Sequence, residues 1–178
     1  MANLKEKYGK EVVPLMMEKF GYKNRFAVPK VEKVVINTGI GKFREEKKAL
    51  EGIENDLKLI TGQKPIYTKA RQAISGFKIR KGLEIGLVVT LRGKRMYDFL
   101  ERFINLALPR ARDFRGIERK SFSGRSLNIG IKEQIVFPEI SHENIQYIFG
   151  LEVSIVTTAK NKEEGLELLK LLGAPIKY

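Results

Sequence analysis

Glu84-Ile85-Gly86-Leu87-Val88-Val89-Thr90-Leu91 has the clearest strand pattern in the chain. Its odd-numbered positions all carry large apolar side chains, whereas its even-numbered positions include a glycine and a threonine. Because successive side chains of a strand point to opposite faces, this alternation is typical of a strand with one face against a core. Arg92 continues the polar side of the pattern. The stretch therefore predicts a sheet with one buried face and one open face.

The rest of the chain supplies further strands and helices around this strand. β-Branched or alternating runs predict strands at residues 31–39, 65–69, 126–131 and 151–158. Apolar residues spaced by three and four predict helices at residues 1–20, 45–61, 96–107 and 161–172. Residues 138–150 are expected to form a polar loop around a short helix.

Prolines, glycines and a capping pair predict where the helices end. Pro14 lacks a backbone donor and is expected to interrupt the first helix, and the third helix is expected to stop near Pro109. Glycines are expected to close the other helices at Gly21, Gly62 and Gly173. Asn161 and Glu164, three residues apart, resemble a capping pair that opens the last helix.

The order of these elements predicts the fold class. Two pairs of strands follow each other without an intervening helix, which implies antiparallel pairing. We therefore expect an α+β fold, a mostly antiparallel sheet with helices packed on one face and a long basic loop between two strands. No repeat or linker divides the chain, so residues 1–178 are expected to form one domain. The open face is then expected to carry polar residues with few acids, namely Lys33, Asn37, Thr90, Arg92, Ser126 and Asn128.

The positive charge of the chain is concentrated in two stretches. The formal net charge is +13. Residues 57–97 contain ten Lys or Arg and one acid, Glu84, and the 27 residues 57–83 contain no carboxylate. Residues 110–125 contain six bases and two acids. A positive field this localised attracts and holds a polyanion such as a nucleic acid.

Composition excludes several kinds of site. The chain has no cysteine, which excludes disulfides, thiolate zinc sites and cysteine nucleophiles. It has one histidine, so no metal site is expected, and no cofactor is predicted. We find no signal-type leader and no apolar run of membrane length, and we expect a soluble, cytoplasmic protein that does not contact a membrane.

Two short motifs are typical of nucleotide or catalytic sites but have the wrong spacing. Gly39-Ile40-Gly41-Lys42 has glycines before a lysine, yet a phosphate-binding loop of this type needs a glycine in place of Ile36 and a hydroxyl in place of Phe43. The alternative is a strand end that turns or that lets an RNA backbone approach. Ser141-His142-Glu143 has the residue types of a hydrolytic triad, but neighbours in sequence rarely face one another. We predict no catalytic residue.

Apolar side chains are mixed into both basic stretches. Residues 71–81 include Ile74 and Phe77 among the bases, and exposed Ile and Phe are unfavourable in water. Their presence favours a loop that is buried against a partner, with an ordinary solvated basic surface as the alternative. Phe114, in the second stretch, either stacks on a base or anchors its loop to the core.

Four segments together resemble one known family. Residues 57–73, LKLITGQKPIYTKARQA, are similar to its signature segment. Residues 33–41 (KVVINTGIG), 86–93 (GLVVTLRG) and 108–116 (LPRARDFRG) resemble it in the same order. On these residues the chain resembles the fifth protein of the bacterial large ribosomal subunit, the protein that carries 5S rRNA, and the similarity runs along the whole chain.

This resemblance implies a non-enzymatic, ribosome-bound α+β protein of the central protuberance that binds 5S rRNA and helps to attach it to the large-subunit rRNA. The 5S rRNA contacts are implied on the sheet face, at Lys33, Asn37, Thr38, Gln63, Thr90 and Arg92. The loop of residues 72–82 is implied to reach P-site tRNA, with contacts at Gln72, Ser75, Gly76, Phe77, Lys78, Arg80 and Lys81. Residues 110–116 and 134–143 are implied to lie near rRNA or at the bridge to a small-subunit ribosomal protein. The basic residues implied there are Arg110, Arg112, Arg115 and Arg125.

Two other functions stay open on the residues alone. A double-stranded DNA-binding module is favoured by charge, but it lacks a recognition helix because the bases fall in loops and strands. A phosphate-handling enzyme, with the basic loop as a lid, lacks a metal-ligand cluster and a complete glycine motif. The RNA-binding hypothesis requires that Asn37, Thr90 and Arg92 lie outside the helix layer and that the two basic stretches border a connected surface.

Overall fold

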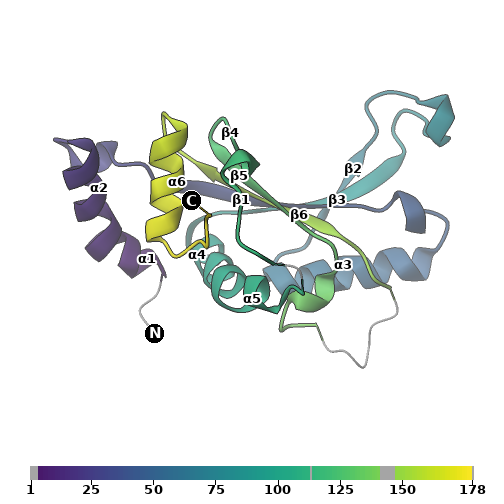
Figure 1. Cartoon of the computed structure of the whole chain (residues 1–178). Coiled ribbons are helices and arrows are strands. Elements are labelled where there is room, and N and C mark those ends of the chain that lie inside the picture. Colours follow the sequence, from purple (N-terminus) through teal and green to yellow (C-terminus); the bar gives the residue numbers. More distant parts are fainter. Residues whose placement is uncertain (1–3, 113, 141–146, 178) are drawn as a thin grey trace.

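The computed structural model describes residues 4–112, 114–140 and 147–177, and a six-stranded sheet forms its centre (Figure 1). The strands are β1 (Val31–Gly39), β2 (Ile66–Lys69), β3 (Glu84–Leu91), β4 (Phe122–Ser123), β5 (Ser126–Ile131) and β6 (Leu151–Thr157). Their order is β2-β3-β1-β6-β5-β4, and every pair is antiparallel. Each predicted strand is present. The structure also contains β4, which was not predicted because two residues are too few to show an alternating pattern.

Helices cover one face of this sheet. The α-helices are α1 (Leu4–Lys7), α2 (Val13–Phe20), α3 (Lys47–Thr61), α4 (Gly93–Arg102), α5 (Leu108–Arg110) and α6 (Lys162–Leu171). Figure 1 shows α3, α4 and α5 along one face and α2 and α6 at one end of the sheet. The predicted α+β class, with an antiparallel sheet and helices on one face, is confirmed.

The core lies between the sheet and the helix layer. Leu87, Val89 and Leu91 of β3 are at most 1% exposed, as their alternation predicts. Phe99 and Phe103 stack with ring centroids 5.7 Å apart, and the ring of Phe137 lies 6.1 Å from each. Stacked aromatic side chains of this size bury much apolar surface, so they hold α4 against the segment that carries Phe137.

Two prolines follow π-helical turns. Pro14 follows the turn Tyr8–Val12 at the start of α2, and Pro109 follows the turn Phe103–Ala107 within α5. A π-turn widens the helix and shifts its hydrogen bonding by one residue, which accommodates a residue that lacks a backbone donor. The chain therefore stays helical through Pro14, and the predicted interruption there was wrong. The predicted stop near Pro109 is confirmed, because α5 ends at Arg110, one residue later.

The predicted helix ends are mostly confirmed. Gly21 and Gly62 have φ angles of 70° and 69°, and their N–H groups donate to carbonyls of the preceding helix turn. The side chain of Asn161 makes no capping hydrogen bond, whereas Glu164 Oε2 accepts from the backbone N–H of Lys160 at 3.0 Å. Half of the predicted capping pair is thus present. The short helix predicted within residues 138–150 falls partly on residues 141–146, outside the described residues.

Candidate nucleic-acid interface

The sheet face opposite α3, α4 and α5 carries rows of side chains that the strand register aligns. We call it the open face. One row comprises Ile66, Val88, Asn37, Glu152 and Gly130, in the order β2, β3, β1, β6, β5. The next row comprises Thr90, Val35, Ser154 and Asn128. In the part of the chain that the structure describes, no helix covers these rows along their length (Figure 1).

Most residues predicted for the 5S rRNA contact lie on this face. Asn37, Thr90 and Arg92 are exposed, and Lys33 is half-buried. Arg92 Nη1 lies 3.6 Å from Glu32 Oε1, and because both side chains are about half exposed this ion pair is weak. The first requirement of the RNA-binding hypothesis is therefore met.

Gln63 joins the open face from the end of α3. Its Nε2 donates to the backbone carbonyl of Thr90 at 3.3 Å, which holds the side chain beside β3. Gln63 is half-buried. The structure thus brings a loop residue, distant in sequence from β3, to the edge of the row that contains Thr90.

Thr38 does not lie on the open face, which corrects the set implied by the resemblance. It is 2% exposed, and its hydroxyl donates to the carbonyl of Gly150 at 2.6 Å. Thr38 shares the inward side of β1 with Val34 and Ile36, as the period of two along the strand requires. Its side chain links β1 to the start of β6 and is not available to a ligand.

The structure adds residues to the open face that the sequence prediction did not include. Glu152 and Ser154 point outward from β6, beside Asn37 and Val35, and Thr68 lies outward on β2. The alternation of Leu151, Val153 and Ile155 in β6 was the sequence signal that would have placed Glu152 and Ser154 on the open face. Glu152 is the acid in the central row, where it can accept a hydrogen bond from a base amine.

Gly86 lets its neighbours on the open face pack closely. A Cβ atom at Gly86 would lie 2.7 Å from Thr68 Oγ1 and 3.0 Å from the carbonyl oxygen of Thr38, so a side chain does not fit. Gly86 is therefore buried, whereas its partner on β1, Gly39, is exposed. The sequence alternative for Gly39, a strand end that turns, is confirmed by the short helical turn Gly41–Phe43 that follows β1.

The segment between β2 and β3 projects from one corner of the sheet as a hydrogen-bonded hairpin (Figure 1). At its base Ala70 and Leu83 are joined by a backbone hydrogen bond, and Ile74 and Ile79 exchange two more. Arg44 Nη1 donates to the carbonyl of Lys78 at 3.2 Å. The basic loop predicted between the two strands therefore contains backbone hydrogen bonds of its own.

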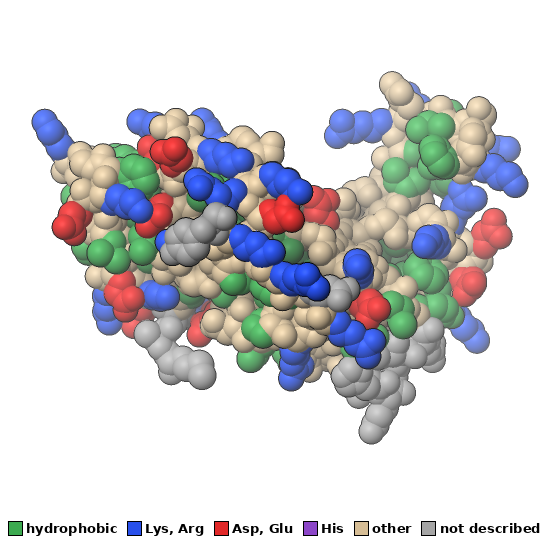
Figure 2. All heavy atoms as spheres, in the orientation of Figure 1, with side chains coloured by type: hydrophobic (Ala, Val, Ile, Leu, Met, Phe, Trp, Pro, Cys, Tyr) green, Lys and Arg blue, Asp and Glu red, His purple; other side chains and the backbone are tan. Residues whose placement is uncertain are grey.

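Side chains of this hairpin face solvent. All of the residues implied to contact tRNA are exposed, namely Gln72, Ser75, Gly76, Phe77, Lys78, Arg80 and Lys81. Phe77 is 73% exposed and Ile74 48%, so the tip presents apolar groups among cations. Figure 2 shows the surface hollowed between this projection and the rest of the molecule, with Lys and Arg side chains on both flanks.

The second basic stretch runs from the helix layer to the opposite edge of the sheet. Arg110 ends α5, whereas Arg125 lies in the turn between β4 and β5, the strands at the edge opposite β2. Arg112 and Arg115 lie between them, and all four arginines are exposed. The two basic stretches thus border one sheet from its two edges. Arg110 lies on the covered side, so the structure does not place the four arginines on the open face together.

Glu118 of the second basic stretch and Gln134 of residues 134–143 already have partners within the protein. A hydrogen bond from the Lys120 ammonium lowers the pKa of Glu118, and the two groups lie 2.6 Å apart. Gln134 is fully buried, and its side chain bonds to the backbone of Tyr147 and Phe149. Gln134 is therefore structural. Ser141, His142 and Glu143 lie outside the described residues.

Other kinds of site have no support in the described ranges. Within residues 4–112, 114–140 and 147–177, no cluster of three His, Cys, Asp or Glu is arranged to hold a metal ion. Over the same residues, no helix is long and apolar enough to cross a bilayer.

The open sheet face, the cationic hairpin and the basic far edge together define a protein that binds nucleic acid through a surface. This class agrees with the similarity of the sequence to known proteins. The family described as "Ribosomal protein L5" matches residues 24–80, and the C-terminal part of the same ribosomal protein family matches residues 84–176. The chain belongs to this family of structural, non-enzymatic ribosomal proteins.

Relatives support the assignment over the full chain. "Large ribosomal subunit protein uL5" of Syntrophomonas wolfei is 58% identical over 178 residues, which cover 99% of this chain and 100% of the relative. The proteins of the same name from Thermoanaerobacter sp. (strain X514) and Dictyoglomus turgidum are each 57% identical, with coverage of 98% and 99% of this chain and the same shares of the relatives. The predicted ribosome-bound, cytoplasmic location agrees with this membership.

Proposed function

We propose that this large-subunit ribosomal protein binds 5S rRNA on its open face and helps to attach it to the large-subunit rRNA. The observation that carries the proposal is the composition of the face, in which Asn37, Thr90 and Arg92 are exposed on or beside adjacent strands and none of the described helices covers them. Polar side chains on a rigid sheet hydrogen-bond to sugar and phosphate, and they position RNA without strong base preference.

Three features support a folded RNA as the ligand. Glu152 and Asn37 offer hydrogen bonds to base edges, and the side chains of Val35 and Val88 offer apolar contact to ribose. The cations at the two edges attract phosphates from both sides of the face. Affinity then comes mainly from phosphate neutralisation.

The exposed hairpin between β2 and β3 is proposed to contact P-site tRNA. Its support is the combination of Phe77 and Ile74 with surrounding Lys and Arg on a projection that extends beyond the sheet. The arginines of residues 110–125 are proposed to contact large-subunit rRNA or to join the bridge to a small-subunit ribosomal protein. Their position on the helix layer and at the far edge leaves the open face to 5S rRNA.

Salt dependence tests the mechanism. If about eight bases contact phosphate, the affinity for 5S rRNA should fall with salt at a log–log slope of roughly −6. A slope shallower than about −2 would contradict phosphate neutralisation as the main source of affinity. Competition against duplex DNA belongs to the same experiment, because stronger retention of the duplex would favour a DNA-binding module.

Two variants test the division of labour between the surfaces. Arg92→Glu should weaken 5S rRNA binding without unfolding the protein, because its ion pair with Glu32 is exposed and weak. Lys48→Glu is the matched control. It changes the net charge equally but lies on α3, on the covered side of the sheet. We expect affinity to fall with Arg92→Glu and to stay near wild type with Lys48→Glu.

Deletion of residues 74–80 removes the tip of the hairpin. It should spare 5S rRNA binding and impair tRNA-dependent function on assembled ribosomes. Equal loss of 5S affinity in the deletion and in Arg92→Glu would show that the two surfaces do not have separate ligands.

A further inference from the structure

Phe26 lies almost entirely in solvent. It is 95% exposed, compared with 73% for Phe77 at the hairpin tip. It belongs to the short helical turn Arg25–Ala27, between α2 and β1. A phenylalanine in this position contributes little to the core, so its side chain is available to a ligand.

The turn that carries Phe26 is held in place by several hydrogen bonds. The side chain of Asn24 accepts from the backbone N–H of Phe26 at 2.9 Å. Arg25 Nη2 donates to the carbonyl of Gly9 at 3.3 Å, and the Tyr8 hydroxyl donates to the carbonyl of Pro29 at 3.0 Å. Because the turn is tied to the first helical segment from both sides, Phe26 is presented by an ordered backbone. A preorganised aromatic group loses little conformational entropy on binding.

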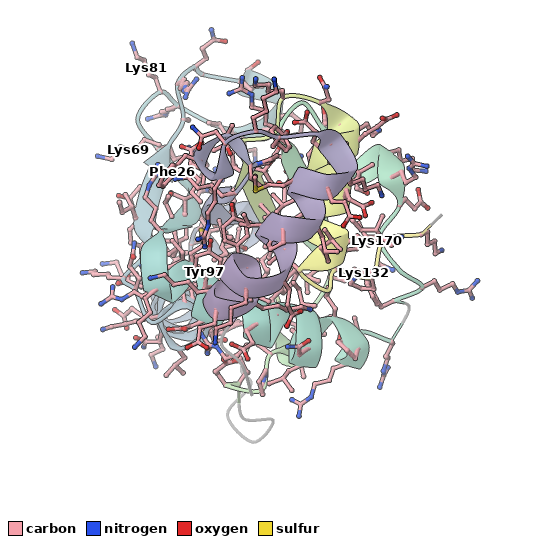
Figure 3. All side chains as sticks on the ribbon, turned by 90° about the vertical axis from the view of Figure 1, so that its left-hand side faces the viewer. Phe26, Lys69, Lys81, Tyr97, Lys132 and Lys170 are labelled. Atoms are coloured by element: carbon pink, nitrogen blue, oxygen red, sulfur yellow. The ribbon has the colours of Figure 1, made fainter. Side chains whose placement is uncertain are left out.

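This turn lies at one end of the open face. Directly after it, the backbone of Lys30 exchanges hydrogen bonds with Thr158, at the end of β6, at 3.0 and 2.9 Å. Arg92, at the end of β3, forms an ion pair with Glu32, which lies two residues after Lys30. Figure 1 shows this segment and the cationic hairpin at opposite ends of the molecule, and Figure 3, which looks along that direction, shows Phe26, Lys69 and Lys81 toward the same edge.

The surroundings of Phe26 are cationic. No Asp or Glu occurs in residues 19–31, whereas Lys23, Arg25 and Lys30 lie close to Phe26 in sequence and are exposed. An aromatic ring flanked along the chain by three exposed cations suits a ligand that combines negative charge with flat rings. An acidic peptide would supply the charge but not the stacking surface, so unpaired nucleotides fit best.

We propose that Phe26 stacks on an unpaired base of the RNA that occupies the open face. The inference rests on the proposed function and extends the interface beyond the sheet, to the turn between α2 and β1. Stacking on an aromatic side chain contributes about 1–3 kcal/mol per base, so removal of the ring should weaken binding at least about fivefold.

Substitutions at Phe26 test the stacking contact. The chain has no tryptophan, so Phe26→Trp introduces a single fluorescent reporter. Its emission should be quenched as 5S rRNA is added, and its affinity should stay near that of wild type. Phe26→Ala and Phe26→Leu should both lose affinity, because leucine keeps apolar surface but cannot stack. Melting temperatures of the free variants should not change, since the ring buries almost nothing.

Phe77→Ala is the matched control, because it removes an exposed phenylalanine from the hairpin, outside the proposed 5S contact. An affinity of Phe26→Ala within about twofold of wild type would overturn the inference. Unchanged emission of Phe26→Trp at saturating 5S rRNA would also overturn it. A response only after ribosomal proteins are added would assign the ring to a protein partner instead. If Arg92→Glu loses affinity while Phe26→Ala does not, the proposed function stands and only the stacking contact is wrong.

Discussion

Gly165→Ala is expected to destabilise the protein, although alanine is the better helix former. Gly165 lies inside α6, where propensity alone favours alanine by about 1 kcal/mol. A Cβ atom there would lie 2.1 Å from Cζ of Phe122 and under 3.0 Å from two more atoms of that ring. Since carbon atoms pack at about 3.5 Å or more, the ring would have to move by about 1.4 Å. Phe122 is 2% exposed, so its neighbours must move too.

The magnitude follows from these two opposing effects. Overpacking of a buried site costs about 1–3 kcal/mol and occasionally more, and three short contacts place this site at the upper end. After the gain in helix propensity is subtracted, the free energy of unfolding should fall by about 2 kcal/mol. The melting temperature should then fall by roughly 4–8 °C, as measured by circular dichroism.

Gly52→Ala provides the matched control. Gly52 is also inside a helix, α3, but a Cβ atom there meets only Tyr147 Cδ2, at an ordinary 3.7 Å. This variant should gain about 0.5–1 kcal/mol of stability. In a double mutant, Phe122→Leu should relieve part of the loss caused by Gly165→Ala, since the two sites touch. A rise in melting temperature for Gly165→Ala similar to that for Gly52→Ala would refute the packing argument.

Four further variants have expected outcomes. Gly86→Val should lower the melting temperature and weaken 5S rRNA binding, because the side chain would clash with Thr68 and with the backbone of Thr38 and so displace neighbouring groups of the open face. Thr38→Val should lower the free energy of unfolding by about 1 kcal/mol, measured by urea denaturation, without changing the RNA affinity of the folded protein. Asn37→Ala should weaken RNA binding and leave the free energy of unfolding unchanged. Burial, followed by the hydrogen bond to a glutamate, raises the pKa of Tyr67 to about 12, above its ordinary value of 10.0. The unfolded chain therefore loses this proton first, so stability should fall as pH rises from 10 to 12, and Tyr67→Phe should reduce that fall in pH-dependent thermal melts.

Much of the fold was predictable because its signals are local. The alternation in β3 places Leu87 and Thr90 on opposite faces, and both lie where the pattern puts them. Gly21 and Gly62 close their helices because only the left-handed conformation completes the end of a helix there. Local rules failed at Pro14, because a π-turn removed the need for the donor that proline lacks.

The candidate site was predictable only in part. Thr38 was assigned to the RNA contact by resemblance, although the period of β1 already placed it beside Val34 and Ile36. The alternation within β6 would have placed Glu152 on the outward side, but its position beside Asn37 depends on the pairing of β6 with β1, which joins residues more than a hundred positions apart. Such pairings decide which side chains form one row.

The sequence by itself determined the class of the fold, the excess of positive charge and the side of each strand that meets the core. Each of these depends on the spacing of side chains within a few residues. Only the tertiary structure decided that β1 lies between β3 and β6, that the two basic stretches border opposite edges of one sheet, and that Phe26 stands at its end. These arrangements depend on contacts between distant segments, whose free energy comes from packing and backbone pairing and leaves no periodic trace along the chain.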